Sequence, residues 1–144
     1  MAYMDKAKTD DWATPQSLFD EWDARYGFTL DVAASSTNAK CLEWFGLDHP
    51  DISRRDGLKV DWYGTVWCNP PYGRQIADWV MKAHVYQGTS VLLLPARTDT
   101  RWFHDYCYMT GRVTIKFLKG RIKFGAGLAP APFPSMVAVF SGKA

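Results

Sequence analysis

The chain has 144 residues, of which 47% are hydrophobic and 15% aromatic, so a single domain with a real hydrophobic core is expected. It contains no run of 18 apolar residues, which excludes a typical membrane-spanning helix. Three cysteines without Cys-x-x-Cys spacing, and no signal-peptide pattern at the start, favour a reduced, cytoplasmic protein.

The net charge of +2 is distributed unevenly. Residues 1–96 carry 9 Lys and Arg against 13 Asp and Glu, whereas residues 97–144 carry 8 against 2. A basic carboxyl-terminal third suits a phosphate backbone, although a solvated basic face is an equally simple explanation.

The start of the chain predicts a polar segment followed by a helix. Residues 1–10 are polar and are expected to be flexible, with a single domain over residues 11–144. Thr14 and Pro15 are placed to begin a helix, as the N-cap and the first helical residue. An apolar stripe continues this helix, and Gly27 is placed to end it.

Acidic and small residues follow the first predicted strand, residues 28–32. Asp31 lies near its end, and Ala33 begins a run of small residues that allows a ligand to approach the backbone closely. A carboxylate at this point suits a ligand ammonium group, although Asp31 is equally placed to be a cap or turn residue. Residues 37–45 then predict a helix, and residues 47–55 predict a loop.

The most informative stretch is Asn69-Pro70-Pro71-Tyr72, which lies between a predicted buried strand, residues 65–68, and a predicted helix, residues 74–87. It therefore occupies a turn at the carboxyl end of a strand, where open α/β sheets bind ligands. The two prolines stiffen the turn, which leaves the Asn69 side chain and nearby carbonyls as fixed hydrogen-bond acceptors. Acceptors that take both N–H bonds of a planar amino group favour a pyramidal nitrogen and stabilise the charge that develops as it attacks a methyl group. The Tyr72 ring beside them is suited to hold a flat substrate by stacking.

Alternating strands and helices in most of the chain predict a doubly wound sheet. Residues 90–94 predict an apolar strand, and a helix with several aromatic side chains follows it. The end of the chain differs, because short strands are predicted at residues 113–118, 121–124 and 136–140, with Lys119-Gly120 as the tight turn of a hairpin. The expected architecture is one α/β domain with a mostly parallel sheet, helices on both faces and an antiparallel carboxyl-terminal hairpin.

Further candidate residues lie in the second half of the chain. Arg97 follows the predicted strand at residues 90–94 and is suited to contact a phosphate. Residues 125–134 predict a loop that can close on substrate or nucleic acid. His104 and Cys107 are spaced to share a metal ion, but no matching second pair exists, so no metal site is expected.

The chain resembles the small phage-type (Dam-like) DNA N6-adenine methyltransferases, which use S-adenosylmethionine. The resemblance covers about residues 11–140 and implies a Rossmann-like methyltransferase fold, a double-stranded DNA partner and a phage or prophage origin. It rests on these segments, in the family's order: Asp11-Trp12-Ala13-Thr14-Pro15, Leu30-Asp31-Val32-Ala33-Ala34, Asp56-Gly57-Leu58, Trp67-Cys68-Asn69-Pro70-Pro71-Tyr72-Gly73, Leu94-Pro95-Ala96-Arg97-Thr98-Asp99-Thr100 and Gly120-Arg121-Ile122-Lys123-Phe124.

The resemblance implies three sets of site residues. The catalytic set is Asn69, Pro70, Pro71 and Tyr72. The cofactor-binding set is Trp12, Thr14, Pro15, Asp31, Ala33, Asp56, Leu58 and Asn69. The set that binds the target base and DNA is Tyr72, Arg97, Arg121, Lys123 and Phe124.

Several of these roles have simpler alternatives. Thr14 and Pro15 are explained by a helix start alone, Asp56 by an Asp-Gly turn, and Phe124 by core packing. The first cofactor loop also lacks the family's usual Gly-x-Gly, which leaves its geometry open.

The favoured hypothesis is therefore methylation of the N6 amino group of adenine in DNA, with the target base extruded from the duplex. The same chemistry on an RNA base or a protein glutamine amide is one alternative. A non-catalytic nucleic-acid-binding module on a decayed methyltransferase fold is another.

Overall fold

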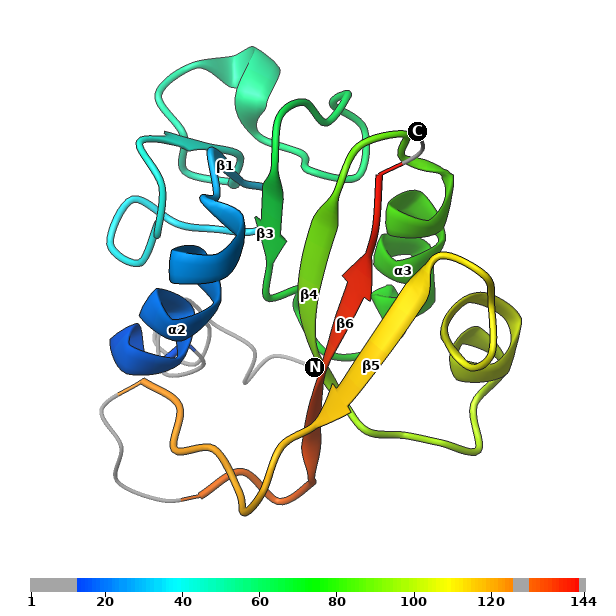
Figure 1. Ribbon diagram of the computed structural model, residues 1–144. Helices are drawn as coiled ribbons and strands as arrows, with labels where there is room; N and C mark the ends of the chain where they lie inside the picture. The colour runs from blue at the N-terminus through cyan, green and yellow to red at the C-terminus, as the bar shows by residue number, and fades with distance from the viewer. Residues whose placement is uncertain (1–12, 126–129, 143–144) are drawn as a thin grey trace.

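The computed structural model describes residues 13–125 and 130–142, so the expectations for residues 1–10 and for Trp12 lie outside the described residues. Six strands form one sheet in the order β2-β1-β3-β4-β6-β5 (Figure 1). Their bounds are Leu30–Asp31 for β1, Glu43–Trp44 for β2, Val66–Cys68 for β3, Ser90–Pro95 for β4, Val113–Phe117 for β5 and Ser135–Phe140 for β6.

Most strand pairs on the amino-terminal side of the sheet are parallel, and those on the carboxyl-terminal side are antiparallel. β1 pairs in parallel with β2 and β3, and β3 pairs in parallel with β4. β6 is antiparallel to both of its neighbours, β4 and β5. The predicted α/β fold with an antiparallel carboxyl-terminal hairpin is confirmed.

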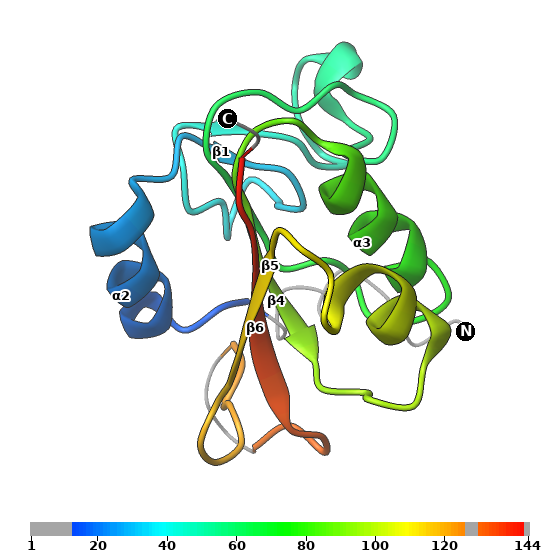
Figure 2. The ribbon, with the colours of Figure 1, turned by 45° about the vertical axis from the view of Figure 1, so that its right-hand side comes forward.

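Helices cover both faces of this sheet. The α-helix α2, Gln16–Tyr26, lies on one face, whereas the α-helix α3, Ile76–Val85, and the π-helical segment η2, Phe103–Cys107, lie on the other (Figure 2). A short 3₁₀ helix, η1, spans Ile52–Arg54. None of the helices in residues 13–125 and 130–142 combines the length and the apolar character that a membrane crossing requires.

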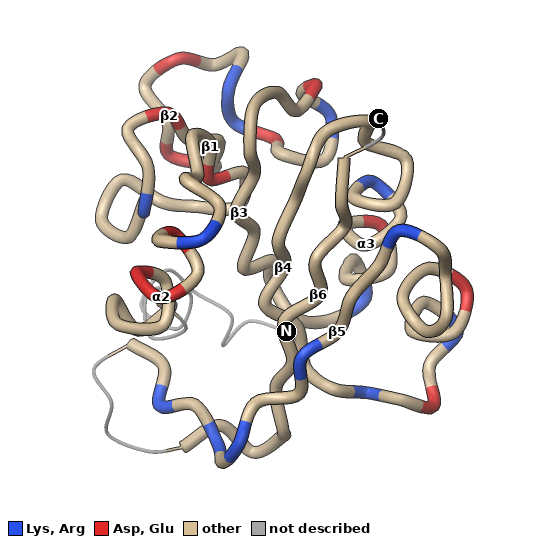
Figure 3. The backbone as a smooth tube through the Cα atoms, viewed as in Figure 1, with Lys and Arg blue, Asp and Glu red and all other residues tan. Residues whose placement is uncertain are grey.

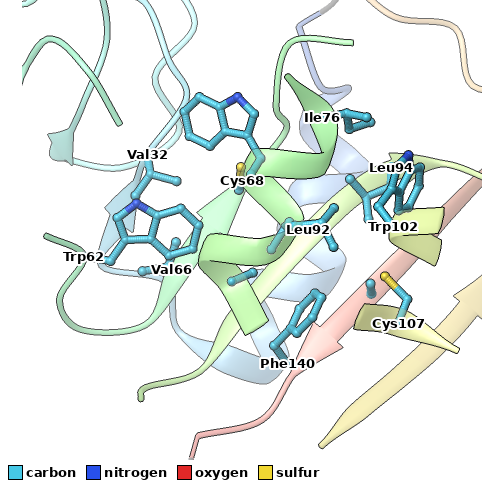
Figure 4. Close-up of a cluster of buried hydrophobic side chains, with 14 of the residues drawn as sticks. Val32, Trp62, Val66, Cys68, Ile76, Leu92, Leu94, Trp102, Cys107 and Phe140 are labelled. Carbon is cyan, nitrogen blue, oxygen red and sulfur yellow. The ribbon is translucent and has the colours of Figure 1, made fainter. Parts of the chain in front are cut away.

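The apolar run of β4 is explained by burial on both faces. Leu92 and Leu94 point into the cluster under α3 and η2 (Figure 4), whereas Val91 and Leu93 pack in the cluster that contains Trp22 of α2. Side chains alternate between the two faces of a strand, so a strand covered on both faces is apolar along most of its length, and in β4 only Ser90 is polar. Full burial of a single leucine such as Leu92 contributes about 1.5–3 kcal/mol relative to exposure.

The helix predicted over residues 37–45 is wrong. Side chains satisfy the backbone of this stretch locally: the Asp31 carboxylate accepts the Lys40 N–H at 3.0 Å, and the Asn38 side chain accepts the Ser35 N–H at 2.7 Å. Such side-chain acceptors compete with helical hydrogen bonds, and the stretch forms turns that lead into the short edge strand β2.

The strand predicted at residues 121–124 is also wrong. The segment runs beside another part of the loop, where Ile122 accepts a hydrogen bond from the Ala131 N–H at 2.8 Å. The hairpin therefore forms between β5 and β6, across a long connection, and Lys119-Gly120 is a turn within that connection. Gly120 has φ +77°, a conformation that favours glycine.

Candidate functional site

The site lies where the sheet changes its winding direction. β1 is flanked by β2 on one side and β3 on the other, so the loops that follow β1 and β3 leave in opposite directions. Asp31 ends β1 and pairs in register with Trp67 of β3, two residues before Asn69. The structure thus places Asp31 and the Asn-Pro-Pro-Tyr turn at the carboxyl ends of adjacent strands, as the sequence predicts.

Asn69 is oriented by a residue far away in the chain. Its Nδ2 donates a hydrogen bond to the Thr14 hydroxyl oxygen at 3.1 Å, and Thr14 is only 5% exposed. Thr14 does not cap α2 as predicted: Pro15 holds the N-cap position, without a side-chain capping bond. The Thr14 hydroxyl is directed to Asn69 instead, and it holds the nitrogen side of the Asn69 amide, whose oxygen is the candidate acceptor.

The segment around Thr14 is held from its other side as well. The Gly125 N–H donates to the Ala13 carbonyl at 2.9 Å, which joins the start of the described chain to the segment after β5. Pro15 then leads directly into α2. The backbone on both sides of Thr14 is therefore held in place, which fixes the position of the Thr14 side chain.

Tyr72 belongs to a cluster of three aromatic rings. Its ring lies edge-on to Phe133 at 5.2 Å between centroids and to Phe124 at 6.1 Å. Burial raises the pKa of the Tyr72 hydroxyl well above its usual value, so the side chain is a neutral phenol at physiological pH. Phe124 is buried in the hydrophobic cluster that also contains Trp67, so the core interpretation and the interpretation as a base contact both fit its position.

Phe133 was not singled out from the sequence. It lies between Pro132 and Pro134, and these two prolines, which restrict the backbone on both sides of Phe133, are the feature of the sequence that could have indicated a fixed aromatic ring. The Arg97 guanidinium lies 5.7 Å from the centre of the Phe133 ring, within the range of a cation–π contact. Arg97, which is exposed after β4, is thus connected to Tyr72 through Phe133.

The Asp31 carboxylate organises the loop after β1. It accepts the N–H groups of Ala33 at 3.3 Å and Lys40 at 3.0 Å, so the loop wraps around it. Burial raises the pKa of Asp31 to about 6, and those two hydrogen bonds and the Lys40 charge oppose the rise. A carboxylate has about four acceptor positions, so these two contacts leave capacity for a ligand donor. The turn role and the ligand role predicted for Asp31 are therefore compatible.

The segment around Asp56 is pressed against the same loop. Gly57 approaches so closely that a Cβ atom there would lie 2.0 Å from the Val32 carbonyl oxygen. The Asp56 carboxylate accepts the Leu58 N–H at 3.0 Å, which is the predicted Asp-Gly turn. Lys82 of α3 donates to the Leu58 carbonyl at 2.9 Å. These contacts bring Asp56 and Leu58 beside the backbone that continues from Val32 into Ala33.

The two remaining basic candidates lie in the connection between β5 and β6. Arg121 and Lys123 are both exposed, and Lys123 immediately precedes Phe124 of the aromatic cluster. In the described part of the chain, no group of three or more His, Cys, Asp or Glu side chains is arranged to bind a metal ion.

Comparison with known proteins identifies one matching family. Residues 2–135 match the family model described as DNA N-6-adenine-methyltransferase (Dam). A search of curated proteins gave no match. The family match spans the turn at Asn69 and every other residue assigned above to the catalytic, cofactor and DNA sets, and the family's activity is methylation of adenine N6 in DNA. The chain therefore belongs to the DNA N-6-adenine-methyltransferase (Dam) family.

Proposed function

We propose that the protein transfers a methyl group from S-adenosylmethionine to the N6 amino group of an adenine that has been extruded from duplex DNA. The observation that carries this proposal is the position of the Asn69 amide, which is hydrogen-bonded to Thr14 and lies just after β3 in the same turn as Tyr72. Family membership supplies the substrate class. The target nitrogen is stacked inside a duplex, so the base must leave the stack before it can react.

The residues around the ends of β1 and β3 fit the proposed cofactor by their chemistry. S-adenosylmethionine carries an ammonium group and an adenine amino group, both of which donate hydrogen bonds. Asp31 and Asp56 offer carboxylate oxygens from two segments that meet near Val32 and Ala33, and Leu58 offers an apolar surface. We assign Trp12, Thr14 and Pro15 to the same set on the family resemblance alone.

The cofactor, when bound, supplies a methyl group on a sulfonium centre, and the C–S bonding electrons return to sulfur as the new N–C bond forms. The protein's part is to bind and orient the amino group. Asn69 Oδ1 and the Pro70 carbonyl accept its two N–H bonds, and Pro71 keeps the turn stiff. These acceptors stabilise the positive charge on N6 during attack, and the surplus proton leaves N6 after the methyl group has arrived.

The Tyr72 ring holds the flat base by stacking, which is worth about 1–3 kcal/mol for an aromatic side chain. Phe124 and Phe133 border this ring. Arg97, Arg121 and Lys123 are exposed cations around the same cluster and are assigned to phosphates. Proximity and alignment of the two reacting atoms supply the rest of the acceleration.

The test is mass spectrometry of nucleosides from the DNA of a methylation-deficient bacterial host that expresses the chain. Wild-type protein is expected to produce N6-methyladenine, and Asn69→Ala to reduce it on the order of 10²–10³-fold, the usual loss for one preorganised electrostatic contact. Calorimetry with S-adenosylmethionine should show a much smaller loss of affinity in the variant, because Asn69 is only one of the eight residues assigned to the cofactor. An equal loss of cofactor binding and of methyl transfer in Asn69→Ala would contradict the role of Asn69. If RNA but not DNA becomes methylated, RNA is the substrate.

A matched pair at Tyr72 tests the stacking role. Tyr72→Phe keeps the ring and should retain most of the activity, because the buried hydroxyl takes no part in the proposed chemistry. Tyr72→Ala removes the ring and should lose about 1–3 kcal/mol of base binding. Similar loss in both variants would show that the hydroxyl, not the ring, matters.

A further inference from the structure

A hollow of about 530 Å³ lies between the start of α2 and the segment that runs from the end of β5 to Lys123. One wall consists of Pro15, Ser17 and Leu18 at the start of α2. The other consists of β5 from Lys116 and the connection that follows it, through Lys123. We call this hollow the basic groove.

The charge of the basic groove is strongly one-sided. Its lining includes Lys116, Lys119, Arg121 and Lys123, all exposed, and a single acidic side chain, Glu21. Lys116 forms an ion pair with Glu21 at 3.7 Å, but both side chains are more than half exposed, so the pair is weak. Figure 3 shows these basic positions following one another along the lower end of β5 and the connection beyond it.

Protection of the sheet edge does not account for this charge. Lysines on an edge strand discourage pairing with other chains, and Lys116 on the edge strand β5 fits that explanation. Lys119, Arg121 and Lys123, however, lie beyond the end of β5, where no strand edge needs protection. Edge protection therefore leaves three of the four cations of the basic groove unexplained.

Both walls of the basic groove lead to the catalytic cluster. Pro15 follows Thr14, which is bonded to Asn69, and Lys123 precedes Phe124, which contacts the Tyr72 ring. The hydrogen bond between the Gly125 N–H and the Ala13 carbonyl joins the two walls at this end. A chain of phosphates in the groove would therefore arrive beside the residues proposed to hold the target adenine.

The groove also carries an exposed aromatic ring. Phe117 at the end of β5 is 58% exposed, although it lies among cations. Aromatic rings beside positive charges are the usual combination for binding nucleic-acid strands, because the ring contacts bases or sugars while the cations contact phosphates.

We propose that the basic groove binds the phosphate backbone of the DNA strand next to the target adenine, with Lys119, Arg121 and Lys123 at phosphates and Phe117 against a neighbouring sugar or base. The proposal rests on the proposed function for the identity of the strand. It extends the DNA contact from Arg121 and Lys123 to Phe117 and Lys119, and it gives those contacts a continuous path.

The test measures binding of a short fluorescent DNA duplex as a function of salt concentration. The double variant Lys119→Gln/Lys123→Gln removes two groove cations, and Lys59→Gln removes an exposed cation from another part of the surface as a matched control. Each lost phosphate contact should lower the magnitude of the slope of log K against log salt by about 0.9, so the double variant should lose about 1.8 and the control nothing.

Binding is measured without methyl transfer, so the two proposals fail separately. A double variant with the wild-type slope, or with the same change as the Lys59→Gln control, would overturn the groove, even if the wild-type protein methylates DNA. Wild-type protein that fails to bind the duplex would overturn it too. The expected slopes without any N6-methyladenine would support the groove and contradict the proposed reaction. S-adenosylmethionine affinity should be equal in all proteins, which also verifies that the variants are folded.

Discussion

Replacement of Thr14 by valine isolates the contact that orients Asn69. Valine has nearly the shape of threonine but lacks the hydroxyl that accepts the Asn69 Nδ2 hydrogen bond at 3.1 Å. Because Thr14 is almost fully buried, water cannot easily replace the lost acceptor. Removal of one partner from a buried hydrogen bond costs about 1–3 kcal/mol.

The expected site of this loss is the catalytic step. If the whole cost falls on the oriented amide in the transition state, about 1–3 kcal/mol corresponds to a fall in kcat of about 5- to 150-fold. The fall in kcat should exceed any rise in the KM for S-adenosylmethionine, although Thr14 is also assigned to the cofactor-binding set. Thr14→Ser keeps the hydroxyl and should retain most of the activity, so it is the matched control.

The assay is steady-state methyl transfer to duplex DNA, combined with calorimetry of cofactor binding for both variants. A Thr14→Val protein with unchanged kcat but weakened cofactor binding would refute the positioning role and leave Thr14 as a cofactor contact. Equal loss in the serine and valine variants would show that packing, rather than the hydroxyl, explains the effect.

Three other substitutions test separate parts of the structure. Burial raises the pKa of Asp31 from 3.8 to about 6, so the contribution of Asp31 to the free energy of unfolding is complete below about pH 4 and is lost as the pH rises through about 6. This loss amounts to about 3 kcal/mol, and urea unfolding at several pH values should show it for the wild type but not for Asp31→Asn. The same pH dependence in both proteins would contradict the prediction. Gly57→Ala would place a Cβ 2.0 Å from the Val32 carbonyl oxygen, so thermal unfolding should show that the free energy of unfolding falls by at least about 1 kcal/mol. Calorimetry should also show weaker cofactor binding, and a variant with the Tm of the wild type would refute the close contact. Phe133→Ala removes a neighbour of the Tyr72 ring and should raise the KM for DNA more than it lowers kcat, and an unchanged KM in the methylation assay would argue against a base-binding role for this cluster.

Local patterns predicted most of the elements that carry the site. The strand before Asn69 and the helix after Tyr72 were predicted with bounds within about two residues of β3 and α3. The strand predicted at residues 90–94 is confirmed as β4, because burial on both faces produces the continuous apolar run from Val91 to Leu94.

The errors occurred where contacts outside the local pattern decide the backbone. Residues 37–45 have helical spacing of apolar side chains, but the buried Asp31 carboxylate binds the Lys40 N–H and holds the chain in a loop. Residues 121–124 have the composition of a strand, but β5 pairs with β6, and the segment is left outside the sheet. In both cases the residues that decide the backbone, Asp31 and the strand β6, lie outside the segment whose structure was predicted.

The sequence by itself determined that the central turn is stiff and follows a buried strand, since two adjacent prolines restrict the backbone wherever the turn lies and the apolar strand before it must be buried. It also determined that cations concentrate after residue 96. Only the tertiary structure decided that Thr14 orients Asn69, that Phe124 and Phe133 border Tyr72, and that the cations beyond β5 line one groove. The physical reason is that these contacts join segments far apart in the chain, and their meeting depends on which strands pair and which face each helix covers.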